Sequence, residues 1–176
     1  RMAEPDEIIQ FIENDLKSQL PLYRKKILIT AGPTYEAIDP VRYIGNHSSG
    51  KMGYALAEAA AGLGAEVILV SGPTALQVKH QNVKLIRVTS AQEMYEEVHA
   101  FYAEVDVAIA AAAVSDYRPR QVASQKIKKD TAEISIELEK TKDILLSLGE
   151  AKKDQFLIGF ALETENEVEN AKGKLK

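Results

Sequence analysis

Short apolar runs that alternate with helical segments restrict the fold of this chain more than any other feature. Residues 52–63 are rich in alanine, which favours a helix, and Ser90 with Glu93 forms a capping-box pattern before a helix that ends near Ala103. Around these helices the sequence predicts strands at residues 26–31, 66–71, 83–88 and 105–110. Strands that are apolar on both faces are typical of a parallel sheet covered by helices on both sides. We therefore expect an α/β fold built on a doubly wound, mostly parallel sheet.

The pattern changes after Val114. Residues 116–130 are polar and basic, and we expect a polar flap there. Residues 134–138 alternate between apolar and polar side chains, as a half-exposed strand does. The remaining segments predict a short helix, a buried strand and a charged helix, at residues 142–149, 155–161 and 166–176. The predicted fold class is therefore α/β and Rossmann-like, with a polar flap.

The start of the chain predicts a separate amphipathic helix. Residues 4–20 carry apolar side chains near helical spacing, Pro5 suits the first turn, and Pro21 stops the helix. We assign residues 1–24 to a linker helix that belongs to an upstream domain. Residues 25–176 form the domain proper, and we expect it to be incomplete at its C-terminus because its last helix has no stop signal.

The composition excludes several classes of protein. The sequence has 22 Lys and Arg against 26 Asp and Glu, a formal net charge of -4, which argues against a nucleic-acid-binding protein. It has no cysteine, so disulfides, thiolate zinc sites and cysteine nucleophiles are excluded. No apolar run reaches the length of a membrane span, and the N-terminus has no signal-peptide pattern. We therefore expect a cytoplasmic protein without a membrane partner.

A long polar loop, expected before the alanine-rich helix, ends in a phosphate-loop-like motif. Residues 45–52 (GNHSSGKM) nearly match that pattern, but Met52 stands where a hydroxyl would ligate magnesium. The motif also lies far from the preceding strand, which argues against a phosphate-loop nucleotidase. Ser48, Ser49 and Gly50 open a helix whose N–H groups and dipole favour an anion. A simple cap for that helix explains the same residues, and both interpretations stay open.

Two further segments are expected to line one crevice. Gly32 follows the first strand, and residues 110–113 are consecutive alanines at the end of the fourth. Ligands of open α/β sheets bind beyond the carboxyl ends of the strands. Close sheet packing explains the alanines as well, and the two interpretations are compatible. The polar stretch from Asp116 adds cations that could neutralise phosphates, although such a run is usually a solvated face. These cations are Arg118, Arg120, Lys126, Lys128 and Lys129.

Several ordered motifs resemble the phosphopantothenate–cysteine ligase family. In the first half they are residues 29–34 (ITAGPT), 39–44 (DPVRYI) and 46–53 (NHSSGKMG). The resemblance extends from about residue 25 to the end of the chain and includes residues 111–118, 126–129 and 158–164. Residues 1–5 resemble the last segment of the flavin-dependent decarboxylase that precedes this ligase in the bacterial bifunctional protein of coenzyme A biosynthesis. The resemblance therefore implies FMN only in that upstream domain.

The resemblance implies a ligation in two steps. The carboxylate of 4′-phosphopantothenate attacks the α-phosphate of CTP, which gives an acyl-cytidylate and pyrophosphate. The amine of L-cysteine then displaces the nucleotide and forms the amide. CTP is the nucleotide of the bacterial bifunctional branch, whereas stand-alone eukaryotic relatives use ATP. The resemblance also implies Mg2+, held mainly by the triphosphate, and a homodimer whose subunits both contribute to each substrate site.

The resemblance also assigns roles to individual residues. Lys126 matches the catalytic lysine, which would stabilise charge at the α-phosphate. Asn46 matches the asparagine that holds the acyl-nucleotide through its neutral amide, and Arg42 would help to hold an anionic substrate. The predicted nucleotide-binding residues are Gly32, Ser48, Ser49, Gly50, Ala110, Ala111, Ala112, Ala113, Asp116, Lys126, Phe160, Ala161, Leu162 and Glu163. No metal-ligating residue is predicted.

Two other functions stay open on the residues alone. The alternation of strands and helices also allows an NAD-dependent redox enzyme. Against it, no G-x-G-x-x-G follows the first strand, and the second strand ends at Ser71 without an acidic residue. A non-catalytic nucleotide-sensing or assembly module is the third interpretation. The family resemblance favours the ligase, and the residues fit its needs, because its reaction gathers several negative charges that the cations of this sequence would offset.

Overall fold

The computed structural model describes residues 3–128 and 133–160 of the chain. Its centre is a five-stranded sheet in the order β5-β4-β1-β6-β9, in which all neighbouring strands are parallel. The strands are β1 (Lys26–Ala31), β4 (Glu66–Ser71), β5 (Val83–Arg87), β6 (Val107–Ala110) and β9 (Phe156–Gly159). The strands predicted from the apolar runs are therefore confirmed. The strand predicted at 155–161 is also present, but it is an edge strand and Phe156 is 65% exposed.

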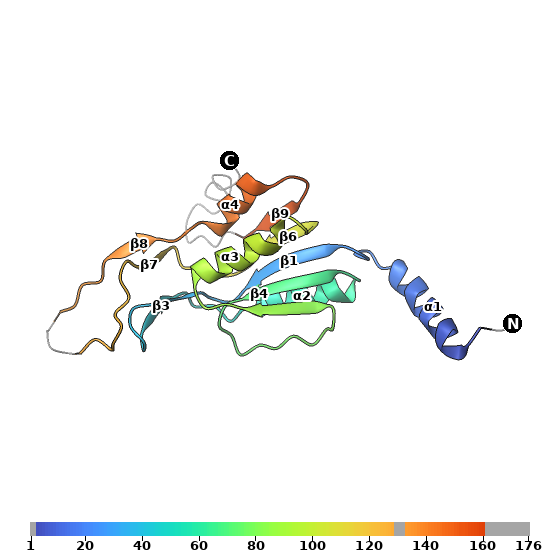
Figure 1. Cartoon of the computed structure of the whole chain (residues 1–176), viewed down its shortest axis with the longest axis horizontal. Helices are drawn as coiled ribbons and strands as arrows, with labels where there is room; N and C mark the ends of the chain where they lie inside the picture. The colour runs from blue at the N-terminus through green and yellow to red at the C-terminus, as the bar shows by residue number, and fades with distance from the viewer. Residues whose placement is uncertain (1–2, 129–132, 161–176) are drawn as a thin grey trace.

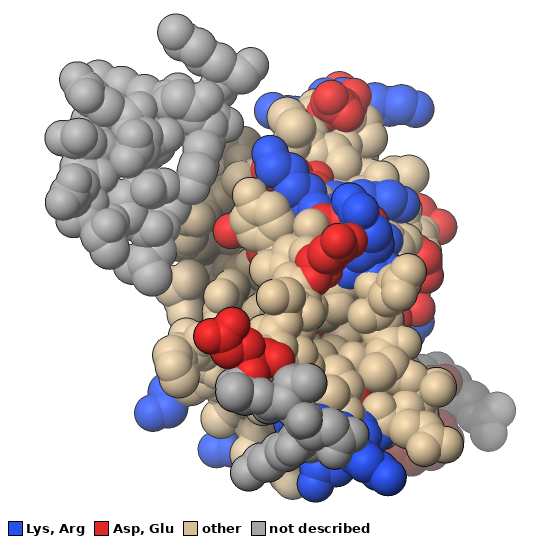
Figure 2. All heavy atoms as spheres, turned by 90° about the vertical axis from the view of Figure 1, so that its left-hand side faces the viewer, with Lys and Arg blue, Asp and Glu red and all other residues tan. Residues whose placement is uncertain are grey.

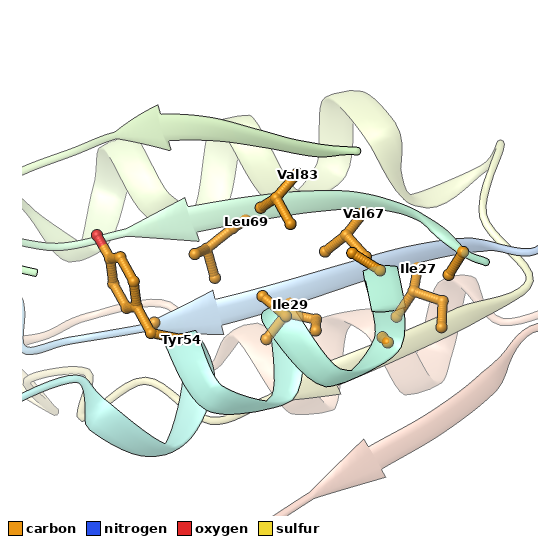
Figure 3. Packing of buried hydrophobic residues seen from close by; sticks show 11 residues of the cluster. Ile27, Ile29, Tyr54, Val67, Leu69 and Val83 are labelled. Carbon is orange, nitrogen blue, oxygen red and sulfur yellow. The ribbon is translucent and has the colours of Figure 1, made fainter. Parts of the chain in front are cut away.

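Helices cover both faces of this sheet (Figure 1). Their bounds are α2 (Lys51–Gly62), α3 (Ala91–Tyr102) and α4 (Ile144–Ala151). Alternate residues of β1 belong to two hydrophobic clusters: Ile29 packs with α2, and Leu28 packs with α3 and α4. Figure 3 shows the α2 side of this core. The predicted doubly wound, Rossmann-like arrangement is confirmed.

Strand β1 is enclosed on both edges and both faces. Leu28 and Ile29 are 1% and 0% exposed, and burial of such a side chain stabilises the fold by about 1.5–3 kcal/mol. Helix α2 lies unusually close to this strand. A Cβ atom on Gly53 would lie 2.5 Å from the Cβ of Ala31, so no larger residue fits there. This approach brings the N-terminus of α2 to the carboxyl end of β1.

Two small antiparallel pairs lie beyond the carboxyl ends of the strands (Figure 1). They are β2 (Tyr35–Ala37) with β3 (Tyr43–Gly45) and β7 (Tyr117–Pro119) with β8 (Leu138–Lys140). The first pair occupies part of the predicted polar loop, so that prediction is wrong for these residues. The strand predicted at 134–138 is displaced toward the C-terminus, because the three residues of β7 pair with residues 138–140. Residues 120–128 of the predicted flap form bends and irregular chain.

The start of α3 is held by acceptors from two elements. The predicted capping box is confirmed: Ser90 Oγ accepts from the N–H of Glu93 at 3.2 Å, and Glu93 Oε2 accepts from the N–H of Ser90 at 3.3 Å. Glu36 of β2, which is 4% exposed, accepts from the N–H of Ala91 at 2.8 Å. The β2–β3 hairpin is therefore fixed to the body of the sheet through α3.

Helix α1 (Pro5–Ser18) confirms the predicted N-terminal helix and stands apart from the sheet (Figure 1). None of its residues is buried. Its large apolar side chains that are exposed are Ile8, Ile9, Phe11, Ile12 and Leu16. No helix within residues 3–128 and 133–160 is long and apolar enough to span a bilayer. The charged helix predicted at 166–176 lies outside the described residues.

Candidate functional site

The order of the strands reverses beside β1. The chain runs from β1 through β4 to β5 on one side of the sheet and then crosses to β6 and β9 on the other. In open α/β sheets, ligands bind at such a switch point, beyond the carboxyl ends of the strands. Figure 2 views this end of the molecule, where charged side chains of both signs surround a largely uncharged middle. The candidate site is therefore the region beyond the ends of β1 and β6.

The segments that leave β1 and β6 stay paired. The N–H of Ala113 donates to the carbonyl oxygen of Gly32 at 2.9 Å, and the N–H of Thr34 donates to the carbonyl oxygen of Ala113 at 3.2 Å. Pro33 and Ala113 form an isolated parallel bridge. The structure thus brings Gly32 next to the alanine run, as the order of the strand ends predicts.

Two buried threonines hold the backbone that follows β6. Thr30 Oγ1 accepts from the N–H groups of Ala111 and Ala112, both at 3.1 Å. Thr34 Oγ1 accepts from the N–H of Ser115 at 2.9 Å. These N–H groups are therefore already paired within the protein. The small side chains of the alanine run leave its backbone accessible.

Three glycines let backbone segments meet at the site. Gly32 and Gly50 have φ angles of +73° and +75°, in the left-handed region that favours glycine. A Cβ atom on Gly50 would lie 3.3 Å from the Cα of Gly32, and one on Gly72 would overlap the carbonyl oxygen of Pro33. The start of α2 and the end of β1 are therefore in direct backbone contact.

The loop between β3 and α2 is fixed by its own side chains. Asn46 Nδ2 donates to the carbonyl oxygen of Val114 at 3.0 Å, which places this loop against the chain after β6. Ser48 Oγ and Ser49 Oγ each accept from the N–H two residues ahead, at 3.3 and 3.5 Å. The N-cap of α2 is Gly50, without a side-chain cap hydrogen bond, so the predicted glycine cap is confirmed and the serines instead hold the turn that leads into the helix. Their hydroxyl protons remain available to an acceptor.

A buried carboxylate joins the β2–β3 hairpin to the flap. Asp39 is 2% exposed. Its Oδ1 accepts from the N–H groups of Val41 and Arg42, both at 2.8 Å. Its Oδ2 accepts from Arg42 Nη1 at 3.0 Å and from the N–H of Ile127 at 3.2 Å. The guanidinium of Arg42 also donates to the carbonyl oxygen of Ile127, at 3.3 Å from both Nη atoms. Lys126 therefore precedes Ile127, whose N–H and C=O groups are both hydrogen-bonded to the hairpin.

These donors determine the ionisation of Asp39. Desolvation by burial raises the pKa of its carboxyl group. The N–H groups of Val41, Ile127 and Arg42, together with the guanidinium charge, lower the pKa by more than burial raises it. The net pKa lies below the ordinary value of 3.8, so Asp39 is a carboxylate at neutral pH.

The other predicted residues are spread over neighbouring elements. Asp116 is exposed, and its carbonyl oxygen accepts from the N–H of Thr141 at 2.9 Å. Phe160 is 51% exposed and follows Gly159, which pairs with Ala110, so Phe160 leaves the sheet beside the alanine run. Three predicted nucleotide-binding residues lie outside the described residues: Ala161, Leu162 and Glu163.

The basic residues of the polar stretch do not act as one group. Arg118 forms an ion pair with Glu139 at 2.8 Å, and Arg120 forms one with Glu137 at 3.3 Å. Both pairs lie across the arm formed by β7 and β8, so the solvated-face interpretation holds for these arginines. Lys126 is exposed and belongs to the segment that Asp39 holds.

Sequence reasoning missed the buried polar residues around the site. Thr30, Thr34, Glu36 and Asp39 are 4%, 0%, 4% and 2% exposed. Thr30 could have been found as a hydroxyl residue within a mainly apolar predicted strand. The Asp39-Pro40 pair is typical of a turn and could have indicated the hydrogen bonds of Asp39 to the nearby backbone. Among the described residues, no group of three or more His, Asp or Glu side chains could hold a metal ion.

Comparisons with known proteins agree with this geometry. A family model described as "DNA/pantothenate metabolism flavoprotein C-terminal domain" matches residues 22–176. The chain is 48% identical over 177 residues to the coenzyme A biosynthesis bifunctional protein CoaBC of Bacillus subtilis, covering 99% of this chain and 44% of that protein. It is 49% identical over 181 residues to a cysteine/cysteine sulfinic acid decarboxylase of an unknown prokaryotic organism, covering 100% of this chain and 50% of that protein. The chain thus spans about half the length of the curated relatives it matches.

Solved structures agree as well. A crystal structure of the C-terminal domain of CoaBC is 56% identical with a TM-score of 0.79, covering 89% of this chain and 74% of that one. A Cab2 variant in complex with phosphopantothenate-cysteine is 20% identical with a TM-score of 0.67, covering 93% and 73%, and shows likeness of fold alone. The chain therefore belongs to the family of DNA/pantothenate metabolism flavoprotein C-terminal domains, as the resemblance to phosphopantothenate–cysteine ligases predicts.

Proposed function

We propose that this chain is the ligase part of a bifunctional protein of coenzyme A biosynthesis. It would join 4′-phosphopantothenate to L-cysteine through an acyl-cytidylate formed with CTP. The observation that carries the proposal is the meeting of three separate motifs at the switch point: Gly32 after β1, the loop 46–50 before α2, and residues 111–113 after β6. The match to the family and to CoaBC proteins supports it.

The reaction needs positive groups because it gathers a triphosphate, a second phosphate and a carboxylate. The start of α2 offers N–H groups and the positive end of the helix dipole beside Gly32. We assign Lys126 to the charge that develops at the α-phosphate and Asn46 to the acyl-cytidylate, following the family resemblance. The guanidinium of Arg42 already serves Asp39, but its side chain is 39% exposed. We assign that exposed part to the anionic substrate.

The nucleotide would lie across the ends of β1, β6 and β9. Gly32 and the alanine run leave room for close approach to the backbone, while Ser48 and Ser49 stand just before the N-cap of α2. Asp116 and Phe160 border the same end of the sheet. CTP as the nucleotide rests on the resemblance. We propose that Mg2+ arrives bound to the triphosphate, as is usual for this ion, and that FMN belongs to the other half of the longer protein.

We further propose a homodimer and a boundary near residue 24. The β7–β8 arm carries exposed apolar side chains that would suit an interface between two copies, namely Tyr117, Val122, Ile134, Ile136 and Leu138. The family match begins at residue 22, after α1, which supports assigning residues 1–24 to the connection with an upstream decarboxylase domain. Sedimentation of the protein across concentrations tests the dimer.

The experiment that tests the function is pyrophosphate release from CTP and 4′-phosphopantothenate, with and without L-cysteine. We expect release with CTP and amide formation only when cysteine is added. ATP in place of CTP tests the choice of nucleotide. Binding of NAD, or release of carbon dioxide from cysteine without pyrophosphate, would contradict the proposal and would support a redox enzyme or a decarboxylase.

A further inference from the structure

The flap segment, residues 126–128, is held to the hairpin by a buried carboxylate and by the guanidinium that this carboxylate binds. We propose that Asp39 is a positioning residue of the ligation: it fixes the flap segment to the β2–β3 hairpin and so keeps Lys126 in place for the reaction. This inference rests on the proposed function, since it requires Lys126 to act on the nucleotide. Asp39 acts through the flap segment and not by touching the substrate.

The contacts of Asp39 divide between the hairpin and the flap segment. A carboxylate has about four lone-pair sites, and four N–H groups use them here. Oδ1 serves the turn at Val41 and Arg42, whereas Oδ2 serves the guanidinium and the N–H of Ile127. Oδ2 therefore serves the flap segment in two ways: it accepts from the N–H of Ile127, and it orients the guanidinium that donates to the carbonyl oxygen of Ile127. The turn depends on Oδ1.

The hairpin connects this attachment with the switch point. The N–H of Ala123 donates to the carbonyl oxygen of Ile38 at 2.9 Å, which is a further bond from the polar stretch to the same hairpin. Strand β3 leads directly into Asn46, whose amide reaches the chain after β6. Lys126 is thus tied through its neighbour Ile127 to the backbone that places Asn46.

A neutral amide in place of the carboxylate would separate the two tasks. In the variant Asp39→Asn, the amide would keep one oxygen for the turn, but its NH2 group would face the N–H of Ile127 and the guanidinium of Arg42, donor against donor. The substitution should therefore release the flap segment and preserve the turn. Asp39 is buried, but asparagine has nearly the same size and shape, so the substitution changes its hydrogen bonding and not its packing volume.

Fluorescence anisotropy tests the attachment without any substrate. The chain has no cysteine, so a single introduced thiol can carry a fluorophore at one place only. The label is attached through Gln125→Cys, an exposed position beside the flap segment. Asp39→Asn should lower the anisotropy of the label, whereas Glu137→Gln, which removes the exposed ion pair with Arg120, should not. Equal anisotropy in Asp39→Asn and in its parent would overturn the inference.

Pyrophosphate release then separates positioning from general damage. Asp39→Asn should lower kcat by about 10- to 100-fold, because misplacing a reacting group by about 1 Å has effects of that size. The KM for CTP should change much less than kcat. In a Lys126→Gln background, Asp39→Asn should cause little further loss, because both substitutions act through one side chain. A full, independent loss in the double variant would overturn the positioning role.

The outcomes keep the two proposals apart. If the parent protein releases no pyrophosphate, the proposed ligase function fails and the positioning role fails with it, while the anisotropy still decides whether Asp39 holds the flap segment. If the parent is active but Lys126→Gln is as fast, the ligase function stands and the positioning role is overturned.

Discussion

The side chain of Asn46 donates a hydrogen bond of 3.0 Å to the carbonyl oxygen of Val114, 68 positions later in the chain. The bond joins the loop before α2 to the segment after β6. An aspartate at position 46 would place a carboxylate against that carbonyl oxygen, acceptor against acceptor. It would also bring a second negative charge beside the acyl-cytidylate.

We expect Asn46→Asp to slow amide formation by about 100-fold, the usual effect of losing one donor to a charged intermediate. The fold should remain intact, because an exposed hydrogen bond contributes only about 1 kcal/mol to stability. Product formation with cysteine and thermal unfolding measure the two effects. His47→Gln, at the exposed neighbouring position, is the control. An unchanged ligation rate in Asn46→Asp would remove the role assigned to Asn46.

Lys126→Gln should slow pyrophosphate release by about 100-fold or more, because it removes a cation from the developing phosphate charge. Lys128→Gln makes the same chemical change two residues away, at another exposed position, and should have little effect. Single-turnover measurements with CTP and 4′-phosphopantothenate compare the two variants. Equal rates in both would show that Lys126 has no special place in the reaction.

Gly72→Ala should destabilise the fold by more than about 3 kcal/mol or prevent folding, because its Cβ atom would overlap the carbonyl oxygen of Pro33. Gly62→Ala is the matched control: a Cβ atom there meets nothing within 4 Å. Since Gly62 is helical, this second change should stabilise the fold by about 0.5–1 kcal/mol. Urea unfolding of both variants checks the contrast, and a Gly72→Ala protein as stable as the parent would refute the close approach.

Acid should destabilise the fold through His99, whose Nε2 lies 2.9 Å from Ser147 Oγ. Desolvation, and then the charge of Lys142, lowers the pKa of His99 below 6.5. The folded state therefore binds this proton less readily than the unfolded chain. The resulting stability is fully present above pH 6.5 and is lost as pH falls through the folded pKa. The unfolding midpoint of His99→Gln should fall less steeply over this range, and equal slopes would contradict the prediction.

Phe11→Ser in α1 should change the stability of the sheet domain by less than about 0.5 kcal/mol, because no residue of α1 is buried. Leu148→Ser in α4 is the contrasting change. Leu148 is 2% exposed, so this substitution should lower the free energy of unfolding by several kcal/mol. Thermal unfolding compares the two. A large loss in Phe11→Ser would show that α1 packs against the domain.

The parallel sheet could be predicted because each of its strands carries its own apolar signal. Four of the six residues of β1 are apolar, three of them in succession, so they indicate burial on both faces without knowledge of their partners. The hairpin β2–β3 gave no such signal, because each strand has only three residues and is placed by bonds to the body of the domain. Strand β8 was predicted four positions too early at its start and two too early at its end, since its bounds depend on the short β7.

The site was only partly predictable for the same reason. The meeting of Gly32 and the alanine run could be predicted from the positions of the strand ends, and Asn46 was singled out by the family resemblance. The burial of Asp39 could not, because its partner Ile127 lies 88 positions away and has no distinguishing sequence pattern. Long-range polar contacts of this kind are fixed by the complete fold and not by local sequence.

The place of β1 in the middle of the sheet also sets the order in which the chain assembles. The pairing of β1 with β4 joins Lys26 to Glu66, whereas the pairing of β1 with β6 joins Ile27 to Val107. The second pairing closes a longer loop, which costs more conformational entropy. During synthesis from the N-terminus, β1, α2 and β4 emerge first and can form a unit with one covered face. The switch point comes into existence only when β6 docks on the other edge of β1. A nucleotide bound there therefore stabilises the finished sheet alone and gives its half-built precursors no protection from proteolysis.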